Sequence, residues 1–102
     1  MQVASVTLRV DQRKRSEALS AIDALMRHMR AWPGCLTCRL YIDATDGTEL
    51  VLMSEWDERR DVEEFLASRD FLILKGMRIL LREDPQALLD DVRSRTQVPL
   101  KR

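Results

Sequence analysis

The sequence predicts a ferredoxin-like α+β fold, with a four-stranded antiparallel sheet covered by helices on one face. Two observations predict it. Apolar residues alternate along three short segments, and they recur with helical spacing along two longer ones. The resulting order is strand, helix, strand, strand, helix, and a final strand would complete the βαββαβ pattern of this fold.

Length and composition indicate one small globular domain, taken as residues 1–102. The 17 basic and 17 acidic side chains cancel, so there is no general attraction to nucleic acid or anionic lipid. No apolar run approaches the roughly 18 residues that cross a bilayer, and the start of the chain does not resemble a signal peptide. We therefore expect a cytoplasmic protein without nucleic-acid or membrane partners.

The first strand and helix follow from simple patterns. Residues 3–10 alternate, which predicts a half-buried strand with a core face formed by Ala4, Val6, Leu8 and Val10. Ser16 is a favourable N-cap for a helix that continues to about Ala31, where Pro33 and Gly34 end it. The apolar stripe predicted for this helix consists of Leu19, Ile22, Leu25, Met26 and Met29.

A hairpin and a second helical region are predicted next. The second strand should direct Leu36, Cys38, Leu40 and Ile42 to the core, and the Asp46-Gly47 turn should connect it to a third strand, Leu50–Trp56. Helical spacing then covers residues 57–67 and 71–81, with an interruption near Ser68. The predicted stripe consists of Val62, Phe65, Leu66, Leu74, Met77 and Leu81.

The last segment has conflicting signals. Asp84-Pro85 is a typical helix start and favours a helix over residues 86–95. Weak alternation of Leu88, Asp90 and Val92 instead suits an edge strand. The local signals leave the two alternatives open, and the order of the earlier elements favours the strand.

The uncovered face of such a sheet would be chemically mixed. It would carry Val3, Thr7, Tyr41, Val51 and Met53 together with Arg9, Arg39 and Glu55. This face is too apolar for water and too charged for a core, so we expect a homodimer that forms through it. Arg39, Tyr41 and Glu55 are its candidate interface residues, although they could instead line a polar cavity.

Cys35 and Cys38 raise the question of redox or metal chemistry. Because residues three apart on a regular strand point to opposite faces, we expect the two side chains to diverge. A zinc site needs about four ligands, and the chain has no second cysteine pair and one histidine. We therefore expect two reduced thiols and no bound metal.

Four short motifs, PGCL (33–36), RLY (39–41), SEWD (54–57) and FLASRDF (65–71), resemble the antibiotic biosynthesis monooxygenase family. The resemblance extends over about residues 3–95. It implies a ferredoxin-like fold that dimerises as an α+β barrel. Some members oxygenate phenols or quinols without any cofactor, and others have no known activity. The related haem-degrading enzymes use an asparagine, a tryptophan and a histidine where this chain has Val6, Phe65 and Lys75, so we reject a haem enzyme.

The resemblance places Trp56 beside a pocket between the helices and the sheet. The substrate-binding candidates there are Cys38, Ser54, Trp56 and Phe65, with further lining from Val6, Leu8, Leu40 and Leu52. This lining suits a small aromatic ligand. The candidate catalytic residues are His28, as a general base, and Trp56, but a packing role is the more common one for both residue types in such positions. Phe65 occupies a position where many members carry a histidine.

Two functions therefore remain open. One is a cofactor-independent monooxygenase acting on a small aromatic or quinol substrate. The other is a non-catalytic dimeric protein of the same fold that binds a small molecule or serves as a scaffold. The residues alone do not decide between them, because a fold resemblance specifies a fold better than a reaction.

Overall fold

The structure, a computed structural model, describes residues 1–101, with the side chains of residues 73–75 left out. Four strands form one antiparallel sheet in the order β2-β3-β1-β4: β1 (Gln2–Arg9), β2 (Cys35–Ile42), β3 (Glu49–Trp56) and β4 (Gln86–Asp91). Helix α1 (Arg15–Ala31) connects β1 to β2. Helices α2 (Arg59–Leu66) and α3 (Arg69–Gly76) and the 3₁₀ helix η2 (Met77–Leu80) connect β3 to β4. The predicted βαββαβ fold is confirmed.

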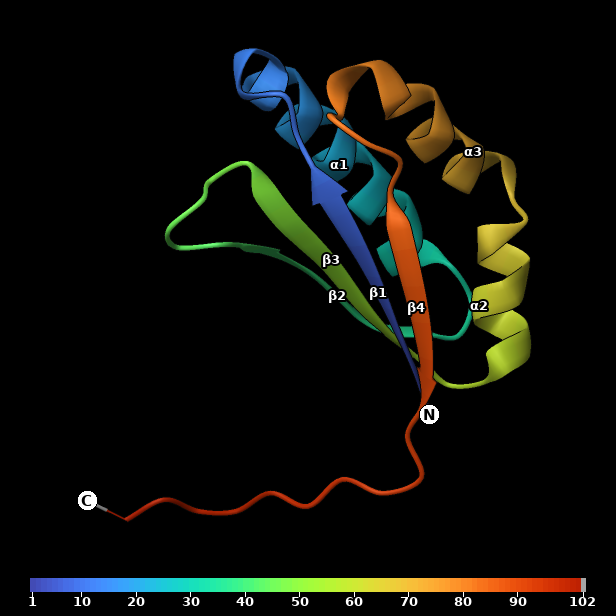
Figure 1. Cartoon of the computed structure of the whole chain (residues 1–102). Helices are drawn as coiled ribbons and strands as arrows, with labels where there is room; N and C mark the ends of the chain where they lie inside the picture. Colours follow the sequence, from blue (N-terminus) through green and yellow to red (C-terminus); the bar gives the residue numbers. More distant parts are fainter. Residues whose placement is uncertain (102) are drawn as a thin grey trace.

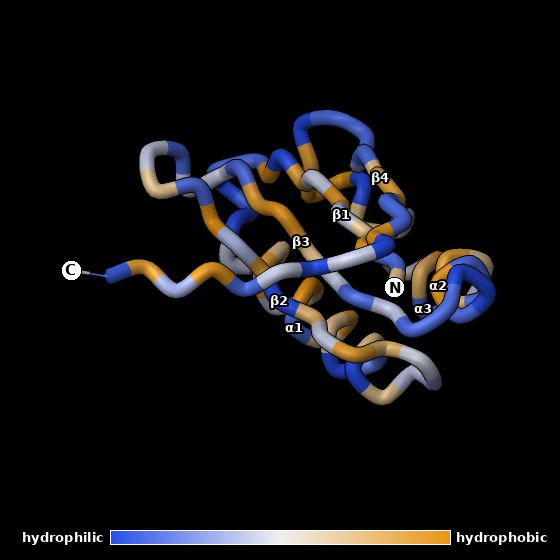
Figure 2. Tube along the Cα trace, turned by 90° about the horizontal axis from the view of Figure 1, so that it is seen from below, coloured by the Kyte–Doolittle hydropathy of each residue, from blue (hydrophilic) through white to orange (hydrophobic). Residues whose placement is uncertain are grey.

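All three α-helices lie against the same face of the sheet (Figures 1 and 2). The segment after β4 leaves the sheet end and runs away from the helices (Figures 1 and 2). One face of the sheet is therefore covered by helices, and we call the other the open face.

Strand β1 lies at the centre of the sheet and pairs with both β3 and β4. Its alternating sequence directs Ala4, Val6 and Leu8 into the core, where each is at most 6% exposed. Val10, just beyond the strand, forms a bridge with Leu81 and is also buried. The predicted core face of this strand is confirmed.

The start of α1 differs from the prediction, because Ser16 does not cap it. Asp11 instead accepts a hydrogen bond from the Arg13 N–H (3.0 Å) and caps the short 3₁₀ helix η1 (Gln12–Lys14), which continues into α1. The helix therefore begins at Arg15, and Ser16 is an exposed residue of its first turn. The predicted apolar stripe is buried, with Leu19 only partly so and with Ala18 added to it.

A β-bulge at the start of β2 changes the predicted faces of that strand. Cys35 pairs with Trp56 and Thr37 pairs with Glu55, so Leu36 is an extra residue without a partner. Leu36 is 55% exposed and Ile42, at the other end of the strand, is 46% exposed, which corrects the expected place of both in the core. The bulge also puts Cys35 and Cys38 on the same, helix-covered face, because it shifts the alternation by one residue.

The second helical region is interrupted at Ser68, as predicted. The Ser68 hydroxyl accepts a hydrogen bond from the Phe71 N–H (3.3 Å), which caps the start of α3. Val62, Phe65, Met77 and Leu81 of the predicted stripe are buried. The side chains of Leu74 and Lys75 lie outside the described residues.

The ambiguous segment forms strand β4, which ends at Asp91 rather than near residue 95. Asp84-Pro85 precedes the strand and does not start a helix. As a strand, this segment pairs with the free edge of β1 and satisfies the backbone N–H and C=O groups there. A helix at this place would leave those groups of β1 without a strand partner. Within residues 1–101, no helix combines the length and apolar character that a membrane crossing requires.

The turn before β2 yields a stability prediction. Gly34 has φ of +87°, and a Cβ placed on it would overlap the carboxylate of Asp61. We expect Gly34→Ala to lower the free energy of unfolding by about 1–3 kcal/mol, because of backbone strain and displacement of Asp61. Gly76→Ala is the matched control, since a Cβ there meets nothing within 4 Å. Equal melting temperatures for the two variants would contradict this explanation.

The open face yields a prediction about assembly. Tyr41, Met53 and Leu88 are exposed on it at 49%, 36% and 68%. We expect a homodimer through this face, with a light-scattering mass of about twice the 11.9 kDa of one chain. A light-scattering mass equal to that of one chain, at micromolar protein concentration, would contradict the predicted dimer.

Candidate functional site

The residues predicted to line a pocket between helices and sheet form a closed core. Cys38, Ser54, Trp56 and Phe65 are at most 4% exposed, and so are Val6, Leu8 and Leu52. The structure brings these residues together in one core cluster. It leaves them almost no contact with solvent, so a ligand would reach them only after the core opened.

The polar groups of this core bind each other. The indole N–H of Trp56 donates a hydrogen bond of 2.8 Å to the Ser54 hydroxyl, and both side chains are buried. Burial of either group alone would carry a desolvation cost, which this pairing removes. In this conformation, therefore, the Trp56 N–H is occupied and is not available to orient a substrate.

An aromatic cluster organises the same core. The Phe65 ring lies between Trp56, with centroids 5.5 Å apart, and Trp32, with centroids 5.4 Å apart in an edge-to-face arrangement. Phe71 adds a further edge-to-face contact at 6.0 Å. Such pairs add roughly 0.5–1.5 kcal/mol each beyond burial. Phe65, at the position where many members of the resembled family carry a histidine, is thus a packing residue.

The two cysteines are closer than the sequence indicated, but their environment disfavours thiolates. The pairing of Cys35 with Trp56 and of Cys38 with Ser54 places them two β3 residues apart, or roughly 7 Å, at the edge of disulfide geometry. Burial raises the pKa of the Cys38 thiol to about 11, with a further rise from Cys35 and a small opposing effect of Arg30. Burial also raises the pKa of Cys35. Cys38 packs against the sulfur of Met29 at 3.8 Å.

His28 lies at the surface, beside a carboxylate. Its Nδ1 is 3.5 Å from Oδ2 of Asp70, with side-chain exposures of 54% and 29%. The two residues line a cavity of about 310 Å³ together with Arg27, Ala31 and Trp32. An aromatic ring, an imidazole beside a carboxylate and a guanidinium therefore meet at one opening.

The sequence did not reveal this arrangement, because 42 positions separate His28 from Asp70. No carboxylate is near His28 in the sequence, and the fold brings Asp70 to it. The last turn of α1 presents His28, and the Ser68 cap fixes the first turn of α3, which presents Asp70. The i,i+4 spacing of His28 and Trp32 was the one local signal, and it predicts proximity without a function.

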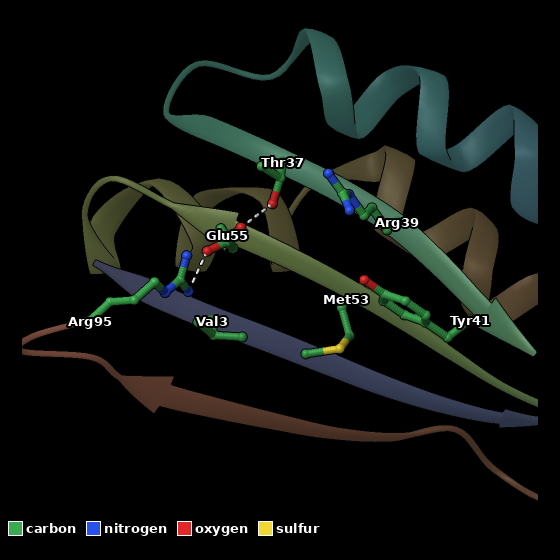
Figure 3. A pocket seen from close by; sticks show the side chains of 7 residues that line it. All are labelled: Val3, Thr37, Arg39, Tyr41, Met53, Glu55 and Arg95. Carbon is green, nitrogen blue, oxygen red and sulfur yellow. Dashed lines mark hydrogen bonds and ion pairs between the residues drawn. The ribbon is translucent and has the colours of Figure 1, made fainter. Parts of the chain in front are cut away.

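A second cavity lies on the open face (Figure 3). Strand pairing sets Thr37, Glu55 and Val3 side by side across the sheet, with Arg39 and Met53 in the next row. Tyr41 and Arg95 complete the lining, and the volume is about 390 Å³. The predicted interface residues Arg39, Tyr41 and Glu55 are thus neighbours, and whether a second copy covers them stays a prediction.

Glu55 is the centre of the polar contacts there. Its Oε1 accepts a hydrogen bond of 2.7 Å from the Thr37 hydroxyl, and its Oε2 pairs with the Arg95 guanidinium at 2.5 Å (Figure 3). The Thr37 hydrogen bond, followed by the contact with Arg95, holds the pKa of Glu55 below its usual value, and the charge of Arg39 acts in the same direction. Arg95 comes from the segment after β4, so sequence analysis of the strands alone could not find it.

Metal ligation has little support in the described part of the chain. No group of three His, Cys, Asp or Glu side chains there is arranged to hold a metal ion. Of the positions compared with haem-degrading enzymes, Val6 and Phe65 are buried core residues. Lys75 lies outside the described side chains.

The fold and the residues define a ferredoxin-like α+β protein, and comparison with family models identifies the family. The antibiotic biosynthesis monooxygenase model matches residues 1–73, more than two thirds of the chain. The chain therefore belongs to the antibiotic biosynthesis monooxygenase family. A search of the curated proteins gives no match.

Solved structures show the same fold over nearly the whole chain. The Rv0793 protein of Mycobacterium tuberculosis is 24% identical, with a TM-score of 0.83 over 95% of this chain and 100% of its own. A candidate antibiotic biosynthesis monooxygenase of Deinococcus radiodurans is 14% identical, with a TM-score of 0.89 over 97% and 99%. One from Nitrosomonas europaea is 18% identical, with a TM-score of 0.84 over 92% and 100%. At these identities the similarity establishes the fold alone.

The cysteine environment gives a prediction for thiol reactivity. Since the thiolate is the reactive form, we expect Cys38 to resist iodoacetamide at pH 7.5, with Cys35 labelled first and both labelled after unfolding. Cys38→Ala should cost about 1–2 kcal/mol of stability from lost packing. Mass spectrometry of labelled peptides checks the order. A Cys35–Cys38 disulfide under cytosolic redox conditions, or bound zinc after purification without added metal, would contradict the prediction.

Proposed function

We propose that this protein is a cofactor-independent monooxygenase that acts on a small aromatic or quinol substrate at the cavity of His28, Trp32 and Asp70. Membership of the family supports the reaction class. The observation that carries the location is the His28–Asp70 pair, 3.5 Å apart, at an opening lined by an indole ring. The predicted core pocket offers no exposed polar group, whereas this cavity does.

The chemistry needs little from the protein, because the substrate supplies the electrons. With an anthrone, one O₂ converts the ring methylene to a carbonyl, and the second oxygen atom leaves with the two methylene hydrogens as water. Loss of a phenolic or enolic proton makes the ring electron-rich enough to reduce O₂. His28 accepts that proton as general base, Asp70 orients the imidazole, and Trp32 stacks on the ring. Arg27, whose guanidinium also pairs with Asp23 at 3.3 Å, lines the same cavity and contributes positive charge that favours the resulting anion.

A second candidate function rests on a different observation. Ser54 and Trp56 satisfy each other's hydrogen bonds inside a closed core, so the family pocket has no free polar group in this conformation. A dimeric protein that binds or organises a small molecule without turnover is compatible with this arrangement. Its ligand would enter by opening the core around Trp56.

Oxygen uptake with a panel of quinols and anthrones tests the proposal. We expect saturable uptake in the wild type and a loss of about 100-fold or more in kcat for His28→Ala, because general bases contribute roughly that much. Added imidazole should restore part of the lost rate, which a purely structural role of His28 would not explain. Asp70→Asn should lower kcat by about tenfold with KM little changed, and Asp70→Glu should recover part of it.

Two further variants separate the alternatives. Arg60→Gln, an exposed change on α2, is the control that should leave uptake unchanged. Trp56→Phe should reduce stability and leave the rate at the surface cavity intact. If uptake does not exceed the uncatalysed rate, while quinone binding is lost in Trp56→Phe, the binding protein is the correct alternative.

A further inference from the structure

We propose that the segment after β4 is an arm that docks on a second copy of this chain, in a groove between the α1 and β2 of that copy. We call this segment, residues 92–101, the tail. Its first part is held by a backbone hydrogen bond between Val92 and Met1 and by the ion pair of Arg95 with Glu55. Within residues 1–101, nothing after Arg95 forms a hydrogen bond or an ion pair with the rest of the chain. The tail runs outward from the end of the sheet and does not fold back on it (Figures 1 and 2).

The end of the tail carries apolar side chains that its own chain leaves uncovered. Val98 is 68% exposed and Leu100 is 92% exposed. In an extended chain these two side chains point to the same side, because they are two residues apart. Pro99 lies between them, and a proline fixes its own φ and keeps the preceding residue extended. The tail therefore loses little conformational freedom when it presents both side chains to a partner.

A groove of matching character lies between α1 and β2, the edge strand of the sheet, and has a volume of about 490 Å³. Its lining consists of apolar side chains, Leu19, Met26 and Leu40, and of polar ones, Asp23, Arg30, Arg39 and Tyr41. Two of the charged groups already have partners. Arg30 donates a hydrogen bond of 3.0 Å to the Cys38 carbonyl, and Asp23 pairs with Arg27 at 3.3 Å. Since the tail is itself basic, the arginines of the lining do not attract it. The contact is therefore apolar, and Val98 and Leu100 provide it.

The position of the groove identifies the occupant as the tail of a second copy. Arg39 and Tyr41 line both the groove and the open-face cavity, so the groove adjoins the face that we expect to form the dimer. The tail leaves from that same face, because Arg95 pairs there with Glu55. The five residues that follow Arg95 span up to about 18 Å when extended, which exceeds the roughly 10 Å between facing sheets. Leu100 of one copy can therefore reach past the open face to the groove of the other.

An intermolecular spin-label measurement by NMR tests the exchange of tails. A nitroxide is attached at Lys101→Cys in a Cys35→Ser background, and this chain is refolded together with ¹⁵N-labelled wild type. We expect the label to broaden the amide signals of Leu19 and Leu40 in the wild-type chain. A label at Glu64→Cys, an exposed position on α2, is the control in the same background and should leave both signals sharp. Native mass spectrometry of the same samples verifies that mixed dimers are present.

Substitutions in the full chain give the matched comparison of affinity. Val98→Ser combined with Leu100→Ser should raise the Kd of the dimer at least about tenfold, because the exchanged tail then buries less apolar surface. Gln97→Ser should leave the Kd within about twofold, because its side chain points to the other side of the extended tail. Added salt should not weaken the dimer, since the contact is apolar. Sedimentation at several protein concentrations measures the Kd, and circular dichroism verifies that the variants fold.

Four outcomes would overturn the proposal. One is broadening of the groove signals only when the spin label and the ¹⁵N atoms are on the same chain, which would show that the tail docks on its own copy. The others are mixed dimers without broadening, an unchanged Kd in the double variant, and a sedimentation mass equal to that of one chain. None of these measurements uses a substrate, so the result is independent of the oxygenase activity.

Discussion

The packing of Phe65 against three aromatic rings is the interaction on which the rest of the structure depends. Its ring joins Trp56 of β3, Trp32 at the end of α1, and Phe71 of α3. It therefore connects the sheet to every helix of the covering layer. Each ring buries a large apolar area, and the edge-to-face geometry fixes the relative orientation of the elements as well as their distance. The consequence is a closed core at the place where the sequence predicted a ligand pocket.

Because this core is closed, the polar side chains that a small molecule could reach lie at the surface. Trp32 is partly buried and is both a member of the cluster and a wall of the His28 cavity. The same packing brings the capped first turn of α3 against the last turn of α1, which sets Asp70 beside His28. A second chemically distinct surface forms on the opposite side, because helices cover one face of the sheet, while strand register and the segment after β4 arrange the side chains of the other.

Much of the fold could be predicted from local patterns. The alternation in β1 and the helical spacing in α1 reflect burial of one face, which is the main driving force of folding and is visible in the sequence. The break at Ser68 follows from a side chain that caps the next helix. The errors were of two kinds: Ser16 lost the capping role to Asp11, and a bulge at Leu36 shifted the alternation. Both depend on backbone geometry at a single residue, which composition and periodicity do not specify.

The sequence by itself determined the family, the order of the elements and most of the core. The chain's apolar periodicity and its short motifs depend on neighbours within a few positions, so they are readable without a structure. The tertiary structure alone decided that Ser54 and Trp56 satisfy each other, that Asp70 lies beside His28, and that Arg95 pairs with Glu55. The last two contacts join groups far apart in the chain. Ser54 and Trp56 are close in sequence, yet they depend on each other only because the helices that cover their strand exclude water from both. Such contacts exist because packing closes the chain on itself, and no local pattern encodes which distant groups then meet.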